Sequence, residues 1–375
     1  MAFNLTSFIH CKDEFIQYQN YEADKVMSNG VLVYGAYGYT GRLIVDKLLE
    51  SGIRPLLSGR NEAKLDEMGK ALGLHFDKID LSEQSALEKL LNQVDLVVHC
   101  AGPFIHTAVP MVKACLTTKT HYIDITGEYN VFDLLKGLGD QANRTGIMLL
   151  PGAGFDVVPS DCLANKLKEQ LPDAEDLILA FTTKGGRLSR GTAKTMVENS
   201  DKGHLIRKNG KLEQFPLGRL IRKVDYGGFT QLSVGISWGD ISTAYYSTKI
   251  PNITVFTGAD KKQLKSLKMA HRLRGLLKLG FVKRFLQKQI DKKPPGPSEE
   301  SRKRSETYLW GKAIKKEKSV ECRLKVPNGY DLTASAVLLI TQKILHGNFK
   351  PGFQTPATAY GKDLIFEIEG CELIP

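Results

Sequence analysis

The sequence predicts an α/β fold in which a doubly wound parallel sheet is joined to a second, α+β unit with a largely antiparallel sheet. In residues 30–160, short apolar runs alternate with helical patterns, an order that is typical of parallel βαβ units. In residues 161–330, strand-like runs follow one another with few helices between them, which favours an antiparallel sheet. The 375 residues suffice for two such units, each with its own core.

Short apolar runs give the predicted strands of the first unit. They are residues 31–34, 55–58, 74–79, 94–99, 122–125 and 147–150. In a doubly wound sheet the ligand binds beyond the carboxyl ends of the strands. The residues that follow each run are therefore the candidate site.

The composition, 42% hydrophobic and 25% charged, is that of a globular protein rather than a disordered or disulfide-rich chain. No apolar stretch reaches the length of a spanning helix. The six cysteines show no C-x-x-C spacing, which is typical of reduced thiols, and we expect a cytoplasmic protein. Residues 1–26 lack the features of a secretory signal, and we expect a loosely attached extension or a start-site artefact before Met27.

The motif GAYGYTG (35–41) follows the first strand and opens a helix, as a dinucleotide-binding loop does. Gly35 permits a tight turn, and Gly38 allows the backbone to approach a pyrophosphate that the helix amides bind. Gly41 allows the helix to pack closely on the strand. The spacing is G-x-x-G-x-x-G rather than G-x-G-x-x-G, so a glycine-rich turn without a ligand remains the alternative. The candidate loop also contains Tyr37, Tyr39 and Thr40.

The end of the second strand indicates which dinucleotide binds. A site for NAD places an acidic residue there, whereas this chain has Ser58, Gly59 and Arg60. The guanidinium of Arg60 suits a 2′-phosphate, so we predict NADP(H). Arg42 and Lys64 either assist or are solvated helix charges.

Two further strand ends complete the predicted cofactor site. Asp80 closes the third strand and either faces the adenine or caps the following helix. After the fourth strand, small residues allow the backbone to lie along the nicotinamide ribose, and a proline ends the strand. The thiol there is interpreted as a packing group rather than a nucleophile, since no base is adjacent in sequence. These residues are Cys100, Ala101, Gly102 and Pro103.

Several motifs resemble the saccharopine-dehydrogenase-like family of NAD(P)-dependent oxidoreductases. They are GAYGYTGRLI (35–44), CAGPF (100–104), HYIDITGE (121–128) and GAGFDVVPSD (152–161). Segments at 237–256, 294–311 and 352–361 are more similar to the branch that includes trans-acting enoyl reductases, which serve polyketide and lipid assembly lines. The resemblance implies a Rossmann-type domain joined to an α+β substrate domain, and a reductase that uses NADPH.

The resemblance also implies that the end of the chain returns to the first unit. We therefore predict a flexible N-terminal extension (1–29), an NADP-binding Rossmann domain (30–160 and 331–375) and an α+β substrate domain (161–330). Within the last of these, the Asn209-Gly210 pair predicts a β-hairpin with a type I′ turn.

The catalytic candidates follow the fifth and sixth strands, because the protein must position the substrate and manage one proton while the cofactor carries the hydride. They are Asp124, Glu128 and Asp156, each with an alternative role as a helix cap. His106 either donates to an enolate or is simply solvated. The hydroxyl groups in residues 240–246 could line the substrate cleft. If this run is a strand, its side chains alternate between the two faces, and only half of the hydroxyls point into the cleft. No metal-spaced His/Cys cluster or Ser/His/Asp pattern is present, so we predict no metal site.

The net charge of +11 is concentrated in one segment, since residues 261–318 contain 19 Lys/Arg and 5 Asp/Glu. Within 261–293, Phe281, Phe285 and other apolar residues share one helical face, and lysines and arginines occupy the other. This pattern fits an anionic membrane surface, an acidic carrier protein that presents an acyl chain, the mouth of an apolar tunnel, or a core-packed helix with a basic back. No motif that reads nucleic acid is present.

The sequence thus predicts a cytoplasmic, peripherally membrane-associated NADPH-dependent reductase of a lipid- or carrier-linked enoyl or carbonyl substrate. A first alternative is a saccharopine-type reductase of an imine-linked amino acid, whose carboxylates would need Arg187, Arg190 and Lys194. A second alternative is a non-catalytic NADP-binding scaffold. A homo-oligomer remains open.

Overall fold

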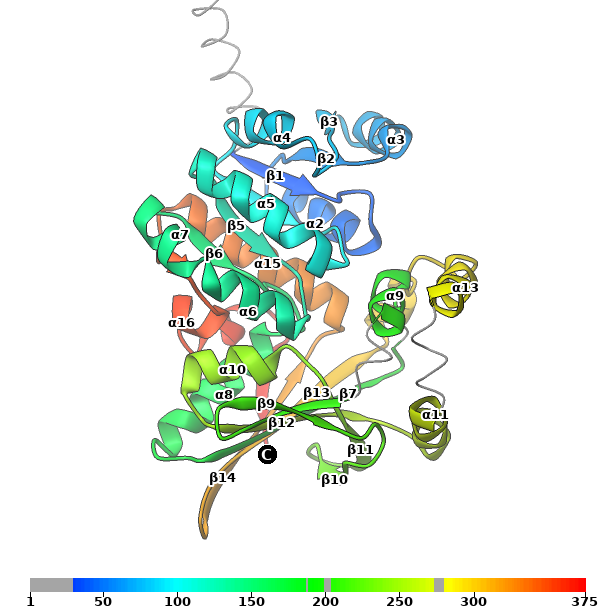
Figure 1. The fold of residues 1–375 in the computed structure, drawn as a ribbon, viewed down its shortest axis with the longest axis vertical. Helices are drawn as coiled ribbons and strands as arrows, with labels where there is room; N and C mark the ends of the chain where they lie inside the picture. Colours follow the sequence, from blue (N-terminus) through cyan, green and yellow to red (C-terminus); the bar gives the residue numbers. More distant parts are fainter. Residues whose placement is uncertain (1–29, 187, 199–203, 273–279) are drawn as a thin grey trace, which may run out of the picture.

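The computed structural model describes residues 30–186, 188–198, 204–272 and 280–375, and Figure 1 shows two units along its long axis. The predictions for the extension 1–29 and for Arg187 lie outside the described residues, as does the middle of the basic segment at 273–279.

The first unit is built on a seven-stranded sheet in the order β15-β6-β5-β4-β1-β2-β3, and every pairing in it is parallel. From β1 the order runs through β2 and β3 on one side and through β4, β5 and β6 on the other. The strand order therefore reverses at β1, and in sheets of this kind a ligand crevice opens at that switch point. The strands are β1 (Val31–Tyr34), β2 (Leu56–Gly59), β3 (Phe76–Lys78), β4 (Leu96–His99), β5 (His121–Asp124), β6 (Met148–Leu150) and β15 (Gly352–Phe353).

Helices cover both faces of this sheet, which is why its strands read as unbroken apolar runs. Helices α2 and α15 pack against each other on one face, and α4, α5 and α6 lie on the other (Figure 1). In β1, Val31 and Val33 belong to one core cluster, and Leu32 and Tyr34 belong to the other. The helices are α2 (Tyr39–Glu50), α3 (Glu62–Leu72), α4 (Gln84–Leu91), α5 (Phe104–Thr118), α6 (Tyr129–Gly137), α7 (Gly139–Thr145) and α15 (Gly329–Leu345).

The second unit is built on a nine-stranded mixed sheet. Its main path is β10-β11-β12-β7-β13-β14-β16, with β8 and β9 attached beside β12, and only the β12–β7 pairing is parallel. The predicted fold class is therefore confirmed. The strands are β7 (Asp176–Lys184), β8 (His204–Lys208), β9 (Lys211–Phe215), β10 (Ile221–Asp225), β11 (Thr230–Ile236), β12 (Asn252–Gly258), β13 (Glu306–Lys315), β14 (Lys318–Val326) and β16 (Glu372–Ile374).

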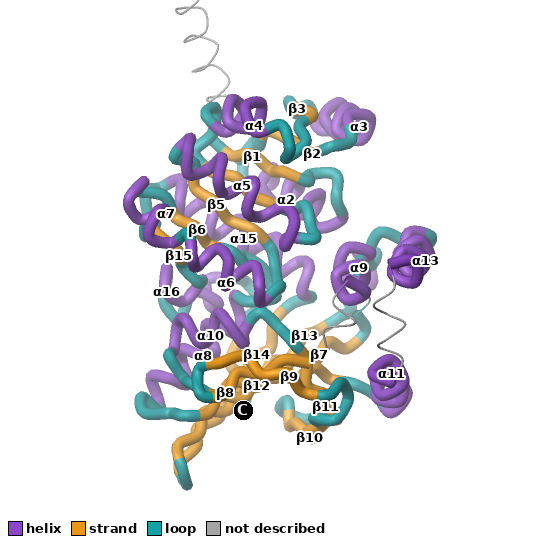
Figure 2. The backbone as a smooth tube through the Cα atoms, viewed as in Figure 1, coloured by secondary structure: helices purple, strands orange, loops and turns teal. Residues whose placement is uncertain are grey.

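Two helices of the second unit lie between the two sheets (Figure 2). Helix α8 packs on β13 and β14, and α10 packs on both α8 and α6. These two are α8 (Val158–Gln170) and α10 (Asp240–Thr248); the others of this part are α9 (Arg190–Glu198), α11 (Lys261–Arg272), α13 (Gly280–Asp291), α14 (Glu299–Lys303), α16 (Pro356–Tyr360) and the short 3-10 helix η1 (Leu364–Glu367).

Two details differ from the sequence prediction. Residues 240–246 belong to helix α10 rather than a strand, because packing against α8 and α6 overrides the strand preference of their β-branched and aromatic residues. Ser242 and Thr243 are consequently buried and do not line a cleft. Strand β16 pairs with β14 in the second sheet, so residues 331–375 do not all lie in the first unit.

The predicted hairpin is present as β8 and β9. Asn209 and Gly210 have φ angles of 49° and 76°, the two left-handed positions that a type I′ turn requires.

Candidate functional site

The glycine loop and the turn after β4 lie against each other at the switch point of the first sheet. Gly35 has a φ of 84°, and a Cβ atom there would lie 3.0 Å from both the amide nitrogen and the Cβ of Ala101. A Cβ atom on Gly41 would overlap the carbonyl oxygen of Gly35. Glycine is therefore required at both positions, and the loop fits tightly under the start of α2.

The amino end of α2 is open to an anion. Gly38 occupies the N-cap position, no side chain caps the helix, and no acidic residue lies in its first turn. Its amides and the helix dipole therefore favour a phosphate group. Thr40 is partly exposed in this first turn, as a ligand contact would require.

Arg60 lies exposed at the end of β2, beside the ring of Tyr37. The amide of Arg60 donates to the hydroxyl of Tyr37 at 3.2 Å, and Lys64 Nζ lies 5.7 Å from the centre of that ring. The two cations and the ring thus lie together at the end of β2, where the sequence predicts that a 2′-phosphate binds. Arg42 is instead paired with Asp46 at 2.9 Å.

Two predicted cofactor residues are engaged in local structure. The buried hydroxyl of Ser58 donates to the carbonyl oxygen of Asp77 at 2.7 Å and thereby ties β2 to β3. Asp80 accepts hydrogen bonds from the amide and the hydroxyl of Ser82, and these bonds lower the pKa of its carboxyl. Asp80 therefore closes a local turn before α4, and the helix-cap interpretation is wrong, because Glu83 occupies the N-cap position of α4 and no side chain caps that helix.

The turn after β4 is held by α5. Thr107 Oγ1 donates to the carbonyl oxygen of Ala101 at 2.7 Å, and Pro103 occupies the N-cap position of α5, with the exposed Gly102 before it. Burial raises the pKa of the Cys100 thiol, so this group stays protonated and packs rather than reacts.

Asp124 anchors the backbone at the end of β5. It accepts hydrogen bonds from the Tyr122 hydroxyl at 2.6 Å and from the amides of Thr126 and Gly152, both at 2.9 Å. Burial raises the pKa of its carboxyl to about 6, against the lowering effect of these three donors. All of these bonds are internal to the fold, so its role here is structural.

Glu128 caps a helix, although not the one that follows it in the chain. Its carboxylate accepts from the amides of Phe104 at 2.8 Å and Ile105 at 3.3 Å, at the start of α5. The negative charge also compensates the positive end of that helix.

Asp156 differs from both of these carboxylates. It lies half-buried between β6 and α8, and a Cβ atom on Gly127 would lie 2.5 Å from its Oδ2. Within the described residues no donor bonds its carboxylate, and burial alone raises its pKa to about 7. This carboxyl therefore exchanges a proton near neutral pH, as a general acid does.

Aromatic side chains of both units surround the Asp156 loop. The Trp238 indole donates to the carbonyl oxygen of Asp156 at 2.9 Å. The ring of Phe181 lies 4.8 Å from that of Trp238 and 5.6 Å from that of Phe155. All three rings are partly exposed. Sequence reasoning did not single out Phe181 or Trp238, although Trp238 lies in the segment 237–256, which is one of those that carry the resemblance.

Tyr39 connects the second unit with α2, the helix that follows the glycine loop and that we call the cofactor helix. Its hydroxyl donates to the carbonyl oxygen of Pro297 at 2.6 Å and accepts from Arg302 Nη1 at 3.1 Å. The ring meets that of Tyr330 edge-on at 5.1 Å. The side chain of Tyr39 is thus directed at the second unit, and only its backbone faces the phosphate position.

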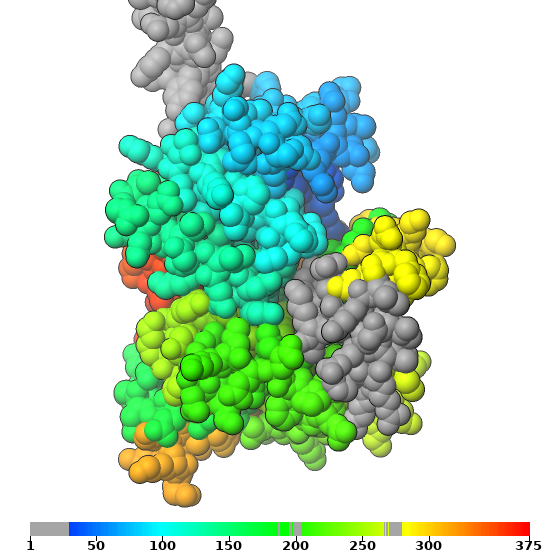
Figure 3. Space-filling view, in the orientation of Figure 1, coloured from blue at the N-terminus to red at the C-terminus, as the bar shows by residue number. Residues whose placement is uncertain are grey.

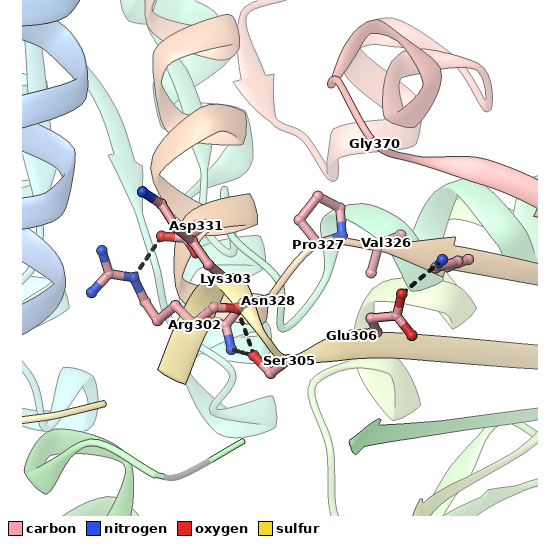
Figure 4. A pocket seen from close by; sticks show the side chains of 10 residues that line it. Arg302, Lys303, Ser305, Glu306, Val326, Pro327, Asn328, Asp331 and Gly370 are labelled. Atoms are coloured by element: carbon pink, nitrogen blue, oxygen red, sulfur yellow. Dashed lines mark hydrogen bonds and ion pairs between the residues drawn. The ribbon is translucent and has the colours of Figure 1, made fainter. Parts of the chain in front are cut away.

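An open pocket lies at this junction, where α14, β13, β14 and the start of α15 converge (Figure 4). Its charges are paired, since Arg302 bonds Asp331 at 2.7 Å and Lys325 bonds Glu306 at 2.8 Å within the pocket, and Lys303 pairs with Glu299 at 2.6 Å outside it. We therefore regard it as a seam between the units rather than the substrate site. Among the described residues, no group of His, Cys, Asp and Glu is arranged to hold a metal ion.

Comparison with known proteins identifies the first unit. Residues 31–150 match the Saccharopine dehydrogenase NADP binding domain family. The whole chain shares its fold with the apo saccharopine dehydrogenase (L-Glu forming) of Saccharomyces cerevisiae, with a TM-score of 0.64 and 16% identity over 92% of this chain and 99% of that one.

Curated relatives match over shorter stretches. A trans-acting enoyl reductase of Mycobacterium leprae is 34% identical over 142 residues, which are 35% of this chain and 33% of that protein. A putative trans-acting enoyl reductase of Mycobacterium tuberculosis is 32% identical over 187 residues, 45% and 43% of the two chains. A saccharopine dehydrogenase-like oxidoreductase of Mus musculus is 25% identical over 201 residues, 47% of each. The matches thus span less than half of each curated relative.

The family match confirms the predicted resemblance for the first unit. Residues 31–150 form an NAD(P)-binding domain of the saccharopine dehydrogenase type, and the chain is related to trans-acting enoyl reductases. None of the helices in the described residues is long and apolar enough to cross a membrane.

Proposed function

We propose that this saccharopine dehydrogenase-like chain is an NADPH-dependent reductase of an enoyl or carbonyl group on an apolar, lipid- or carrier-linked substrate. The observation that carries the proposal is Asp156, a carboxyl with a pKa of about 7 and without a donor among the described residues, beside partly exposed aromatic rings. A proton donor with an apolar wall is what reduction of such a substrate requires.

The first unit contains the residues that would hold the dinucleotide. The open amino end of α2 would bind the pyrophosphate, and Arg60 would select the 2′-phosphate because its guanidinium is exposed and no acidic residue replaces it at the end of β2. The turn at residues 100–102 would border the nicotinamide ribose. When bound, NADPH supplies the hydride.

The residues of this chain supply the substrate site and the proton. Phe155, Phe181 and Trp238 would bind the apolar part of the substrate and exclude water from it. Asp156 Oδ2 would hold the proton below about pH 7 and transfer it to the substrate atom that becomes negative. Asp124 and Glu128 would position β5 and α5 without taking part in the proton transfer.

Of the three cations considered for an imine-linked amino acid, Arg187 lies outside the described residues and the other two are already engaged. Arg190 Nε donates to the carbonyl oxygen of Lys293, and Lys194 is paired with Asp291 at 2.6 Å. An apolar substrate is therefore the better fit to the described residues of the second unit.

Turnover of defined substrates tests this proposal. Purified protein is mixed with NADPH and either medium- and long-chain enoyl thioesters or iminodiacids, and NADPH oxidation is followed by absorbance. Oxidation with enoyl thioesters supports the proposal. Oxidation with iminodiacids alone would favour the saccharopine-type reaction, and tight NADPH binding without any turnover would favour a scaffold.

A further inference from the structure

Helices α11 and α13 are both rich in lysine and arginine, and we call the two together the basic arm (residues 261–272 and 280–291). Figure 1 shows α9, α11 and α13 to one side of the sheets, and Figure 3 shows α13 projecting from the side of the molecule. Helix α13 packs along α9, and Ile290 is the only buried residue of α13.

Apolar side chains on and beside the basic arm are exposed. Phe281 is 64% exposed, Phe285 60%, Leu188 58% and Met269 52%. These four are half of the large apolar side chains that are exposed in the described part of the chain. The core-packed interpretation of residues 281–290 is therefore wrong for the two phenylalanines. The predicted separation of apolar and basic faces is wrong as well, because Arg284 and Lys288, each three positions after a phenylalanine, are exposed on the same face.

Cations accompany these apolar groups. The exposed ones in the arm and directly after it are Lys261, Lys262, Lys265, Arg284, Lys288, Lys292 and Lys293. The acidic Asp291 is neutralised by Lys194 of α9. The described part of the arm thus presents a positive surface that contains two protruding phenylalanines.

We propose that the basic arm docks this protein on the surface of an anionic bilayer. Phenylalanines that stand among lysines and arginines on a projecting helix suit the boundary between lipid headgroups and acyl chains. The cations would meet the anionic headgroups, each with an attraction of about 1 kcal/mol, or about fivefold in affinity. An acidic protein would match the cations but would need a preformed recess for each phenylalanine. The acyl region of a bilayer accepts both rings without any preformed recess.

The segment that directly follows α13 is bonded both to α9 and to the cofactor helix α2. The amide of Arg190, at the start of α9, donates to the carbonyl oxygen of Pro295 at 2.9 Å, and Tyr39 of α2 bonds Pro297 at 2.6 Å. A docked arm would therefore bring the amino end of the cofactor helix to the membrane surface, which adds a location to the proposed function without resting on it.

Vesicle flotation with the full-length protein, free of nucleotide and substrate, tests the docking. Vesicles of phosphatidylcholine alone are compared with vesicles that also contain phosphatidylglycerol. We expect binding to the anionic vesicles, little binding to the neutral ones, and loss of binding in about 1 M salt, where the screening length falls to about 3 Å.

Matched variants assign the binding to the arm. Phe281→Ser/Phe285→Ser should weaken binding by at least about tenfold, because two buried rings are lost from the lipid. Leu134→Ser, which changes a side chain of α6 that is 46% exposed, should bind like the wild type. Thermal melting of each variant verifies that it is folded.

Charge reversal gives a second comparison. Lys288→Glu/Lys292→Glu should bind anionic vesicles at least about tenfold more weakly, because two attractive charges become repulsive. Lys211→Glu/Lys318→Glu changes two exposed lysines of the second sheet and should have a much smaller effect.

Three results would overturn the docking proposal. They are no binding of the wild type to anionic vesicles, binding of the phenylalanine variant at the wild-type level, and arm-dependent binding of an acidic acyl carrier protein in place of vesicles. NADPH oxidation with soluble enoyl thioesters should be the same in all of these variants, so a failure of docking is distinguishable from a failure of the proposed reaction.

Discussion

The phenol oxygen of Tyr39 donates a hydrogen bond of 2.6 Å to the carbonyl oxygen of Pro297, which lies 258 positions further along the chain. Arg302 donates to the same phenol oxygen and is itself paired with Asp331 at the start of α15. The first residue of the cofactor helix is thus bonded to the segment that connects the basic arm with the second sheet.

Tyr39→Phe should lower the free energy of unfolding by about 1–3 kcal/mol, because both hydrogen bonds of the phenol oxygen to the second unit are lost. Chemical denaturation measures this change, and limited proteolysis should cleave the 294–302 segment faster. Tyr308→Phe removes a hydroxyl that bonds the adjacent Glu306 and should be closer to neutral. Equal stability of the two variants would mean that the Tyr39 contact does not join the units.

Arg60→Asp should weaken NADPH binding by about 1.5–3 kcal/mol, because the 2′-phosphate loses a charge-assisted partner and meets a negative charge instead. Binding of NADH should change little. Fluorescence titration with each dinucleotide measures both affinities. Arg42→Ala, which removes a guanidinium paired with Asp46, serves as the control, and an equal loss for both dinucleotides would contradict the assignment of Arg60.

Asp156→Asn should lower kcat by about 10²–10⁴-fold, because the amide cannot supply the proton. Burial raises the pKa of this carboxyl to about 7, so the acid is protonated below that pH and loses its proton above it. The wild-type rate should therefore fall as the pH rises through about 7, while the residual rate of the variant should lack this step. A variant with an unchanged pH profile would remove Asp156 from the proton transfer.

Tyr122→Phe should destabilise the fold by about 1–3 kcal/mol, because the buried carboxylate of Asp124 loses a donor. The pKa of Asp124 is already raised to about 6, above its unfolded value, so stability falls as the pH rises from about 4 to about 6. Without the Tyr122 hydroxyl this decrease should be larger and should extend to higher pH. Melting temperatures measured across this range give both effects.

Tyr360→Phe is the matched control for Tyr122→Phe. The hydroxyl of Tyr360 is buried and has no hydrogen-bond partner in the described structure, so its removal should be neutral or stabilising. Similar destabilisation by both substitutions would show that packing, and not the bond to Asp124, explains the effect.

The first unit was predictable because its local signals agree with the tertiary structure. Its strands are short apolar runs buried on both faces, and its glycine loop stands directly between β1 and α2. The Asn209-Gly210 turn is equally local. In contrast, β13 escaped prediction, because a proline-rich stretch precedes it and lysines lie among its residues. Its partner β7 is more than 120 residues away.

The candidate site was predictable only in part, because several of its contacts are not local. Glu128 could be recognised as a capping residue, but the amides that it caps lie 23 and 24 positions earlier and meet it only once β4 and β5 are paired. Asp156 could be placed after β6, whereas its neighbours Phe181 and Trp238 come from the second unit. No periodicity in the sequence joins these residues.

Helix α15 packs on α2 and strand β15 pairs with β6, so both belong to the first unit. Strand β16 then pairs with β14 in the second sheet. Within the described residues the polypeptide therefore passes from one sheet to the other three times: before α8, before α15 and before β16. Neither unit could therefore be separated by a single cut in the gene. Truncation after β14, for example, would remove α15, the longest described helix of the first unit. Any relative movement of the two units must therefore be accommodated at three chain connections rather than at one.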